Sequence, residues 1–129
     1  MRLTVTAAML AFGLLGAASA QNNPVQRASE KGLASWYGAP YDGQPSASGE
    51  IYHQDELTAA HRTLPFGTLV RVRRLDNQKS VVVRINDRGP FIQSRVIDLS
   101  RAAARRLGMN NAGLAPVALE VLDAPAAGE

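Results

Sequence analysis

The sequence predicts a small, mainly-β barrel formed by a single domain. Short runs of β-branched and aromatic residues recur along the 129-residue chain, with Gly, Pro, Asn and Asp between them. One run alternates apolar and charged residues with the period of two that a half-buried strand requires. Only one segment carries a strong helix signal, so the pattern differs from the strand–helix alternation of a parallel βαβ sheet.

Both ends of the chain are expected to lie outside this domain. Met1–Ala20 has a basic start, an apolar stretch and a small-residue end, as a secretory signal peptide does. Its apolar stretch is too short for a membrane span, which needs about 20 residues. We therefore expect an exported, soluble protein with a flexible lead-in over Gln21–Lys31, a domain over Gly32–Asp123 and a tail over Ala124–Glu129.

Composition narrows the range of partners. The chain has no cysteine and a formal net charge of +3. An exported domain without disulfides depends on its own core for stability, and without cysteine no lipid anchor on that residue is expected. Arginines and lysines gather on one predicted hairpin and one predicted helix. This charge suits an anionic cell-wall polymer, and nucleic acid is not an expected partner of an exported protein.

The first strand is expected over Gly32–Gly38. Trp36 and Tyr37 are large enough for the core or for the floor of a sugar-binding groove. The loop over Ala39–Gly49 is rich in Pro, Gly, Ser and Asp, and loops of this length are usually functional or disordered. Glu50 follows it, either as a functional carboxylate or as a solvated loop residue.

A short helix is expected next, over Asp55–His61, because helix formers follow an acidic start. His61 at its end is either structural or able to tune a nearby carboxylate. Neither His53 nor His61 has a second histidine at i+3 or i+4, and the chain has no cysteine. We therefore expect no metal site.

A hairpin follows, and it leads to the most suggestive carboxylate in the chain. Thr68–Leu75 alternates apolar and arginine side chains, and Asp76–Gln78 forms a turn into the β-branched run Ser80–Ile85. The run breaks at Asn86–Pro90, whose residue types favour a sharp turn. Asp87 thus stands at the exit of a rigid strand, a good position for an acid or base, although Asp also stabilises such turns.

The clearest helix lies near the C-terminal end. Ser100 fits an N-cap, Arg101–Leu107 is rich in Ala, and Gly108 ends the segment. Because Asp98 directly precedes this helix, a capping or dipole role is expected for it. The last strand is expected over Pro116–Leu122.

Five blocks of the sequence form a recognisable series: Ala34–Gly38, Ala47–Glu50, Leu57–Thr68, Val81–Pro90 and Val96–Ser100. Together they resemble the rare lipoprotein A (RlpA) family of peptidoglycan lytic transglycosylases, over nearly the whole predicted domain. The resemblance implies a six-stranded double-psi β-barrel with one or two short helices and an active groove across it. It also implies periplasmic cleavage of the β-1,4 bond between N-acetylmuramic acid and N-acetylglucosamine, without water, to give a 1,6-anhydromuramyl end.

The resemblance also implies roles for individual residues. Asp87 matches the catalytic acid/base, Glu50 a second functional carboxylate, and His61 a histidine needed nearby. One carboxyl group can protonate the glycosidic oxygen and later accept the C6 hydroxyl proton, and a second carboxylate beside it can raise its pKa. The residues expected to bind substrate are Tyr37, Trp36, Arg88 and His53. No bound cofactor is expected.

The sequence departs from the family pattern at three points. His53 stands where the family usually has an acidic residue, which could weaken activity or lead to a different use of Asp55 or His53. The cysteine of a lipid anchor, frequent in the family, is missing. The chain also ends soon after the predicted barrel, where many members continue into a domain that binds denuded septal glycan.

Two other functions stay open for such a barrel. An expansin-like module would bind or loosen wall glycan without cleaving it, and a hydrolase would use two carboxylates with a water between them. Convergence of Asp87, Glu50 and His61 on one groove would favour an enzyme, and scattered side chains would favour a binding module. In each case the expected partner of the monomer is a peptidoglycan glycan strand, with no membrane anchor.

Overall fold

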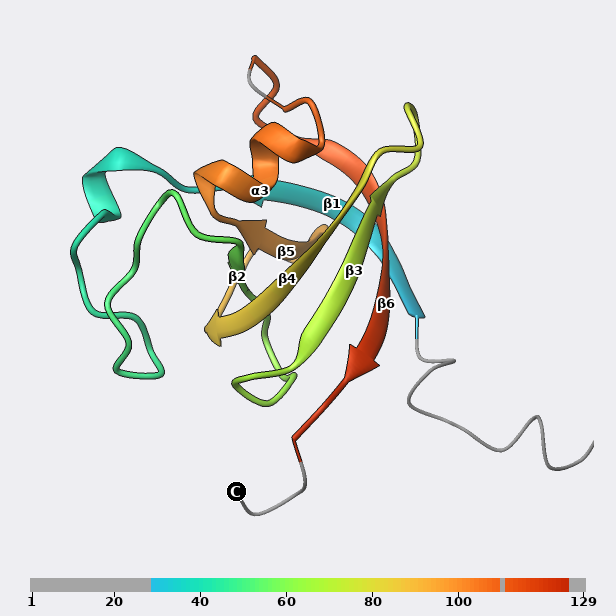
Figure 1. Cartoon of the computed structure of the whole chain (residues 1–129). Coiled ribbons are helices and arrows are strands. Elements are labelled where there is room, and N and C mark those ends of the chain that lie inside the picture. Colours follow the sequence, from blue (N-terminus) through green and yellow to red (C-terminus); the bar gives the residue numbers. More distant parts are fainter. Residues whose placement is uncertain (1–28, 110, 126–129) are drawn as a thin grey trace, which may run out of the picture.

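The computed structural model describes residues 29–109 and 111–125, which form a closed β-barrel (Figure 1). Its strands are β1 (Ser29–Trp36), β2 (Thr58–Ala60), β3 (Leu69–Arg74), β4 (Ser80–Asp87), β5 (Arg95–Leu99) and β6 (Ala115–Asp123). A 3-10 turn, η1 (Ala39–Tyr41), and one α-helix, α3 (Arg101–Arg106), complete this part of the chain. The prediction of a mainly-β, six-stranded barrel is confirmed.

The strands follow one another around the barrel in the order β1-β5-β2-β4-β3-β6, and β6 pairs with β1 to close it. The pairs β1–β5 and β2–β4 are parallel, whereas the other four pairs are antiparallel. Because the barrel is closed, every strand has a neighbour on both sides, and the exposed edges of an open sheet are absent.

Alternating side chains fill the barrel interior. Along β6, buried positions alternate with partly exposed ones, and the arginines of β3 lie outside while its valines lie inside, as the sequence predicts. The largest interior group consists of β-branched and leucine side chains: Val70, Val72, Val81, Val83, Ile85, Ile97, Leu99, Val117 and Leu119. Such side chains pack well on a pleated surface, so an apolar core holds the barrel together.

Helix α3 begins at the predicted residue, Arg101, and ends at Arg106, one residue before the predicted end. Ser100 Oγ accepts a hydrogen bond from the Ala103 N–H at 3.2 Å, which satisfies one of the free donors of the first turn. Gly108 has a φ of +73°, in the left-handed region that ends helices. The buried Ala103 and Ala104 hold the helix against the barrel.

The prediction of a helix over Asp55–His61 is wrong. Its second half forms the strand β2, in which all three residues are buried between β4 and β5. Helix propensity is a weak preference of well under 1 kcal/mol per residue, and pairing on both sides of β2 outweighs it. The preceding residues form turns, one of which is closed by the Glu56 N–H bonding to the His53 carbonyl at 3.0 Å.

Strand β6 exceeds its predicted range by one residue at each end, and β1 and β4 differ from theirs by more. β1 begins at Ser29, since Ser29–Lys31 pair with β6, and it ends at Trp36. These three residues were expected in the lead-in. β4 continues beyond Ile85 to Asp87, because β2 pairs along it. The expected signal peptide over residues 1–20, the rest of the lead-in and residues 126–129 of the tail lie outside the described residues.

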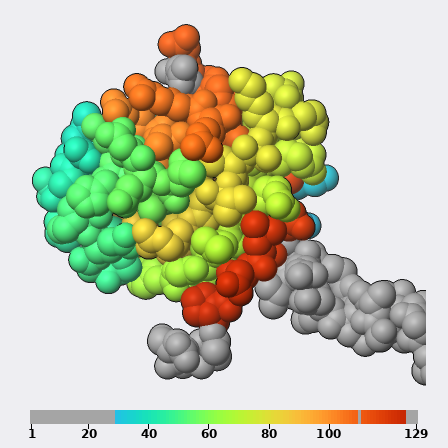
Figure 2. All heavy atoms as spheres, viewed as in Figure 1, coloured from blue at the N-terminus to red at the C-terminus, as the bar shows by residue number. Residues whose placement is uncertain are grey.

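A long segment between β1 and β2 leaves the barrel on one side (Figure 1) and packs against it (Figure 2). The expected loop is therefore present, and it is anchored to the end of β4 by a hydrogen bond from the Ser48 N–H to the Asn86 carbonyl, 3.3 Å long. Within the described residues, we find no helix with the length and apolar character that crossing a membrane requires.

Gly32→Ala is expected to lower the free energy of unfolding by about 1–3 kcal/mol, because overpacking displaces neighbouring side chains. A Cβ at Gly32 would lie 2.4 Å from Cγ1 of Val96 on β5. Gly113→Ala is the matched control, since nothing lies within 4 Å of its Cβ position. Urea denaturation measures both variants, and equal stabilities would contradict the close approach of β1 and β5.

Candidate active site

A cleft of about 240 Å³ lies between the β1–β2 segment and the ends of three strands. Its lining residues are Tyr37, Tyr41, Gln44, Pro45, Ser46, Tyr52, Ala60, Asp87, Arg88 and Asp98. The two carboxyl groups come from β4 and β5, which lie on opposite sides of β2. Both Asp87 and Asp98 are register partners of Ala60, so two strand spacings, roughly 10 Å, separate their Cα atoms.

A β-bulge turns Asp87 toward the cleft. The pairing of β2 with β4 passes from Ala59–Ile85 directly to Ala60–Asp87, so Asn86 is an extra residue of β4. A regular strand would direct Asp87 to the same side as the buried Val83 and Ile85. The bulge instead buries Asn86 and leaves Asp87 half-buried on the cleft wall, as bulges near functional sites often do.

Backbone groups from three segments hold Asp87 in place. Its Oδ1 accepts hydrogen bonds from the Ala47 N–H at 2.8 Å and from the Arg88 N–H at 2.9 Å. Its backbone carbonyl accepts one from the His61 N–H at 3.2 Å. The carboxyl group therefore has a fixed orientation that does not depend on a flexible side chain.

Asp98 is the functional candidate that sequence reasoning missed. The expected capping role is wrong, because Ser100 caps α3 and Asp98 lies within β5. Its Oδ1 accepts a hydrogen bond from Ser35 Oγ at 3.2 Å. Burial raises the pKa of Asp98 to about 6, the negative charge of Asp87 adds to this, and Ser35 and Arg95 oppose it. The available signal was a carboxylate within the otherwise apolar run Val96–Leu99.

Three tyrosines form another wall of the cleft. The ring centroids of Tyr37 and Tyr52 are 4.5 Å apart, and Tyr41 meets Tyr37 edge-on at 5.8 Å. The Tyr52 hydroxyl donates to the Tyr37 carbonyl at 2.8 Å, which fixes the pair. Tyr41 is 55% exposed and offers a free ring surface to a sugar. Burial, and next the charge of Asp87, raise the pKa of Tyr37, so its hydroxyl stays protonated.

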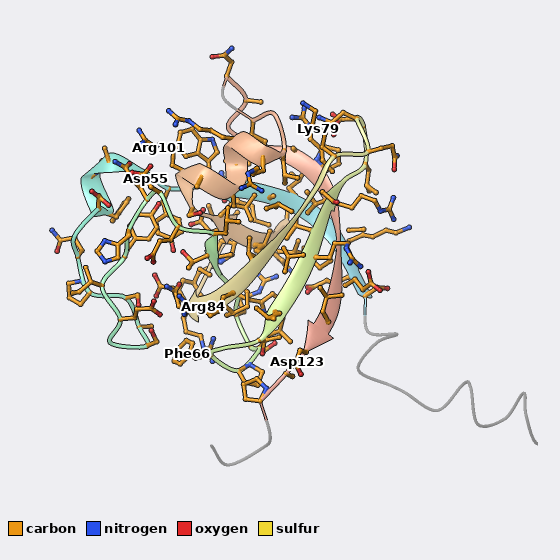
Figure 3. All side chains as sticks on the ribbon, viewed as in Figure 1. Asp55, Phe66, Lys79, Arg84, Arg101 and Asp123 are labelled. Carbon is orange, nitrogen blue, oxygen red and sulfur yellow. The ribbon has the colours of Figure 1, made fainter. Side chains whose placement is uncertain are left out.

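Glu50 lies outside this cleft and forms an ion pair with Arg84 of β4. Its two carboxylate oxygens each accept a hydrogen bond of 2.7 Å from the guanidinium, which lowers the pKa of Glu50. Figure 3 labels Arg84 where β4 faces the β1–β2 segment. Such a bidentate pair is geometrically specific, and it fixes the segment that carries Ala47.

The His61 ring also faces away from the cleft. It is 6% exposed, and its Nε2 lies 2.9 Å from the Glu30 carboxylate. The ring lines a separate cavity of about 160 Å³ beside Glu30, Thr63 and Leu119. Of the three residues that the resemblance marks as functional, the structure therefore brings only Asp87 to the cleft.

The residues expected to bind substrate also divide between sites. Tyr37 and Arg88 line the cleft, whereas His53 is exposed outside it. Trp36 packs against the core, donates from Nε1 to the Ala112 carbonyl at 3.3 Å and lines a different cavity. That cavity also contains Arg101, whose guanidinium points toward Asp55 (Figure 3) and bonds to it at 2.7 Å.

No cation site is evident within residues 29–109 and 111–125, where no three His, Cys, Asp or Glu side chains group closely enough to bind a metal. The cleft lining offers two carboxyl groups, tyrosine hydroxyls and one guanidinium. Paired carboxyl groups of this kind can transfer protons and stabilise positive charge on a sugar ring.

Comparison with known proteins identifies the class of the barrel. Residues 29–119 match the family described as lytic transglycolase, and the chain belongs to this family. The family assignment confirms the double-psi β-barrel, and relatives named RlpA confirm the resemblance to that family.

Relatives with high identity include the probable endolytic peptidoglycan transglycosylase RlpA of Synechocystis sp., 58% identical over 91 residues. The endolytic peptidoglycan transglycosylase RlpA of Pseudomonas aeruginosa is 56% identical over 92 residues. These matches cover 70% and 71% of this chain but only 28% and 27% of the relatives. The chain thus matches less than a third of the length of either relative.

Solved structures support the fold. The apo expansin of Clavibacter michiganensis superposes with a TM-score of 0.61 at 23% identity, covering 77% of this chain and 52% of the expansin. A Streptomyces papain inhibitor superposes with the same TM-score of 0.61 at 21% identity, covering 75% of this chain and 96% of the inhibitor. At these identities the shared feature is the barrel.

Asp98→Asn is expected to stabilise the protein at high pH. Because burial raises the Asp98 pKa from 3.8 to about 6, the folded state holds its proton where the unfolded chain has lost it. Wild-type stability therefore falls as pH rises from about 4 to 6, and the cost remains at higher pH. The variant should gain up to about 3 kcal/mol near pH 8 and nothing near pH 3.5.

Urea denaturation at both pH values measures this gain. Asp123→Asn, which makes the same substitution at an exposed position near the C-terminal end of the barrel (Figure 3), is the control. A variant no more stable than wild type near pH 8 would show that Asp98 is not destabilised by burial.

Proposed function

We propose that this barrel is the catalytic domain of a lytic transglycosylase. It cleaves the β-1,4 bond between N-acetylmuramic acid and N-acetylglucosamine in peptidoglycan and leaves a 1,6-anhydromuramyl end. The observation that carries the proposal is the pair Asp87 and Asp98, which face one open cleft from opposite sides of Ala60. The names of the RlpA relatives supply the substrate class.

The two carboxyl groups have different roles in the proposed reaction. Asp98 is the proton donor, because a pKa of about 6 leaves roughly a tenth of it protonated at pH 7, far more than a carboxyl group of ordinary pKa. It protonates the glycosidic oxygen as the bond to C1 of N-acetylmuramic acid breaks. The C6 hydroxyl oxygen of the same sugar then bonds to C1 and returns its proton to Asp98, so no water is consumed.

Asp87 supplies the negative charge that this reaction needs. The ring carbon carries positive charge as the glycosidic bond breaks, and a fixed carboxylate nearby stabilises it. The backbone bonds to Asp87 Oδ1 orient the group before substrate arrives. In this proposal Asp98 takes the place of Glu50 as the second carboxyl group of the site. It is also Asp98, rather than Asp87, that donates the proton.

One observation favours the alternative function, an expansin-like module that binds glycan without cleaving it. Glu50 and His61 do not face the cleft, and scattered side chains are what a module that only binds glycan would have. The tyrosine wall would serve such a module equally well. Cleavage products distinguish the two functions.

We further propose that the domain works outside the cytoplasm, in the periplasm, with Met1–Ala20 as its signal peptide. A wall polymer is accessible there, and the basic surface of the chain suits an anionic partner. The glycan strand is then the partner, bound by a monomer.

Asp87→Asn is expected to abolish cleavage of purified glycan while leaving the melting temperature and glycan binding nearly unchanged. The asparagine Oδ1 can still accept the Ala47 and Arg88 hydrogen bonds, whereas the charge is lost. Loss of a group that acts on the transition state costs roughly 10²–10⁴-fold in rate. Mass spectrometry of digests of intact and peptide-free glycan provides the measurement.

The products decide between the functions. Anhydromuramyl ends that disappear in the variant support the transglycosylase, and reducing ends indicate a hydrolase. Glycan binding without products in the wild type supports the binding module. Unfolding of the Asp87→Asn variant would mean that Asp87 stabilises the strand end.

A further inference from the structure

His61 is fully hydrogen-bonded within the protein. Nε2 lies 2.9 Å from the Glu30 carboxylate, and Nδ1 accepts hydrogen bonds from the Thr63 and Leu64 N–H groups, each 3.1 Å long. The ring is buried, with 6% of the residue exposed. Both ring nitrogens are therefore occupied away from the cleft.

The hydrogen-bond partners of the ring define which of its nitrogens carries the proton. Backbone N–H groups can only donate, so Nδ1 must be the unprotonated nitrogen. The carboxylate of Glu30 can only accept, so the one ring proton lies on Nε2. A histidine in this state has no free donor or acceptor to offer a substrate.

The ring shapes a turn that holds Arg88. The two N–H groups bound by Nδ1 belong to the segment His61–Leu64, which curls around the imidazole. The Arg88 guanidinium donates from one nitrogen to the Leu64 carbonyl at 2.9 Å and to the His61 carbonyl at 3.3 Å. The same guanidinium lies over the Phe66 ring, 4.0 Å from its centroid (Figure 3 labels Phe66).

Both this turn and Arg88 are hydrogen-bonded to Asp87. The Arg88 N–H donates to Asp87 Oδ1 at 2.9 Å, and the His61 N–H donates to the Asp87 carbonyl at 3.2 Å. A continuous set of contacts thus runs from Glu30 on β1, through His61 and Arg88, to the cleft carboxyl. Every link in it joins adjacent groups at hydrogen-bond distance.

We propose that His61 is a positioning residue for Asp87, with Glu30 as its orienting partner, and is neither an acid nor a base in the reaction. The unprotonated Nδ1 fixes the turn, the turn holds Arg88, and both fix the end of β4. This inference rests on the proposed function for the role of Asp87, and it replaces the catalytic role expected for His61.

Two variants separate positioning from proton transfer. In His61→Asn the side-chain oxygen can occupy the place of Nδ1 and accept from the Thr63 and Leu64 N–H groups. In His61→Gln the longer amide reaches toward Glu30 and leaves those groups unbound. Neither side chain titrates, so an acid or base would be lost equally in both.

Cleavage of purified glycan by the two variants is expected to differ. His61→Asn should retain activity within roughly tenfold of wild type, with the shape of its pH profile unchanged. His61→Gln should lose roughly 10²-fold, as for a reacting group displaced by about 1 Å. Comparable losses in both variants, with both still folded by circular dichroism, would overturn the proposal.

A measurement independent of activity completes the test. Nitrogen-15 NMR of the folded wild type near neutral pH should show His61 with its proton on Nε2 and none on Nδ1. The Thr63 and Leu64 amides should exchange slowly with solvent in wild type and His61→Asn, and faster in His61→Gln. A proton on Nδ1, or equal exchange in all three proteins, would overturn the proposal.

These readouts also separate the two proposals. A wild type that cleaves no glycan contradicts the proposed function alone, and the tautomer and amide exchange still decide whether His61 fixes the turn. If the wild type cleaves glycan and both His61→Asn and His61→Gln are equally inactive, only the positioning role is contradicted.

Discussion

The arrangement of the site depends on the pairing of β2 between β4 and β5. Ala60 has Asp87 as its register partner on one side and Asp98 on the other, and its methyl group leaves room between the two carboxyl groups. The bulge at Asn86 sets which β4 side chain occupies that place. A strand of three buried residues therefore fixes the separation and the orientation of both acids.

Charges around the cleft are arranged so that one acid releases its proton only at a higher pH than usual. Glu50 is held by Arg84 at the side of the segment, whereas Asp98 is buried, with Ser35 and Arg95 compensating only part of the cost. The destabilising burial of a carboxyl group is typical of functional sites rather than of structural ion pairs. In the proposed reaction, stability and catalysis are thus opposed at Asp98, as they often are at active sites.

Much of the fold could be predicted from the sequence, because its strands and helix α3 have strong local signals. Alternation in β3 and the Ser100 cap are examples. Strand β2 could not be predicted, since its pairing partners are distant in sequence and helix propensity is a weak preference. For the site, the turn-forming residues after β4 drew attention to Asp87. The proposed roles of Asp98 and His61 depend on burial and on contacts with β1, which the spacing of residues in the sequence does not reveal.

The central claim is that burial beside Asp87 raises the pKa of Asp98, and the most direct test is a carbon-13 NMR titration of the Asp98 carboxyl group. The account predicts a pKa of about 6 in wild type and a lower pKa in Asp87→Asn, since removal of a neighbouring negative charge favours the ionised form. A wild-type pKa near the ordinary 3.8, or one that Asp87→Asn leaves unchanged, would contradict it.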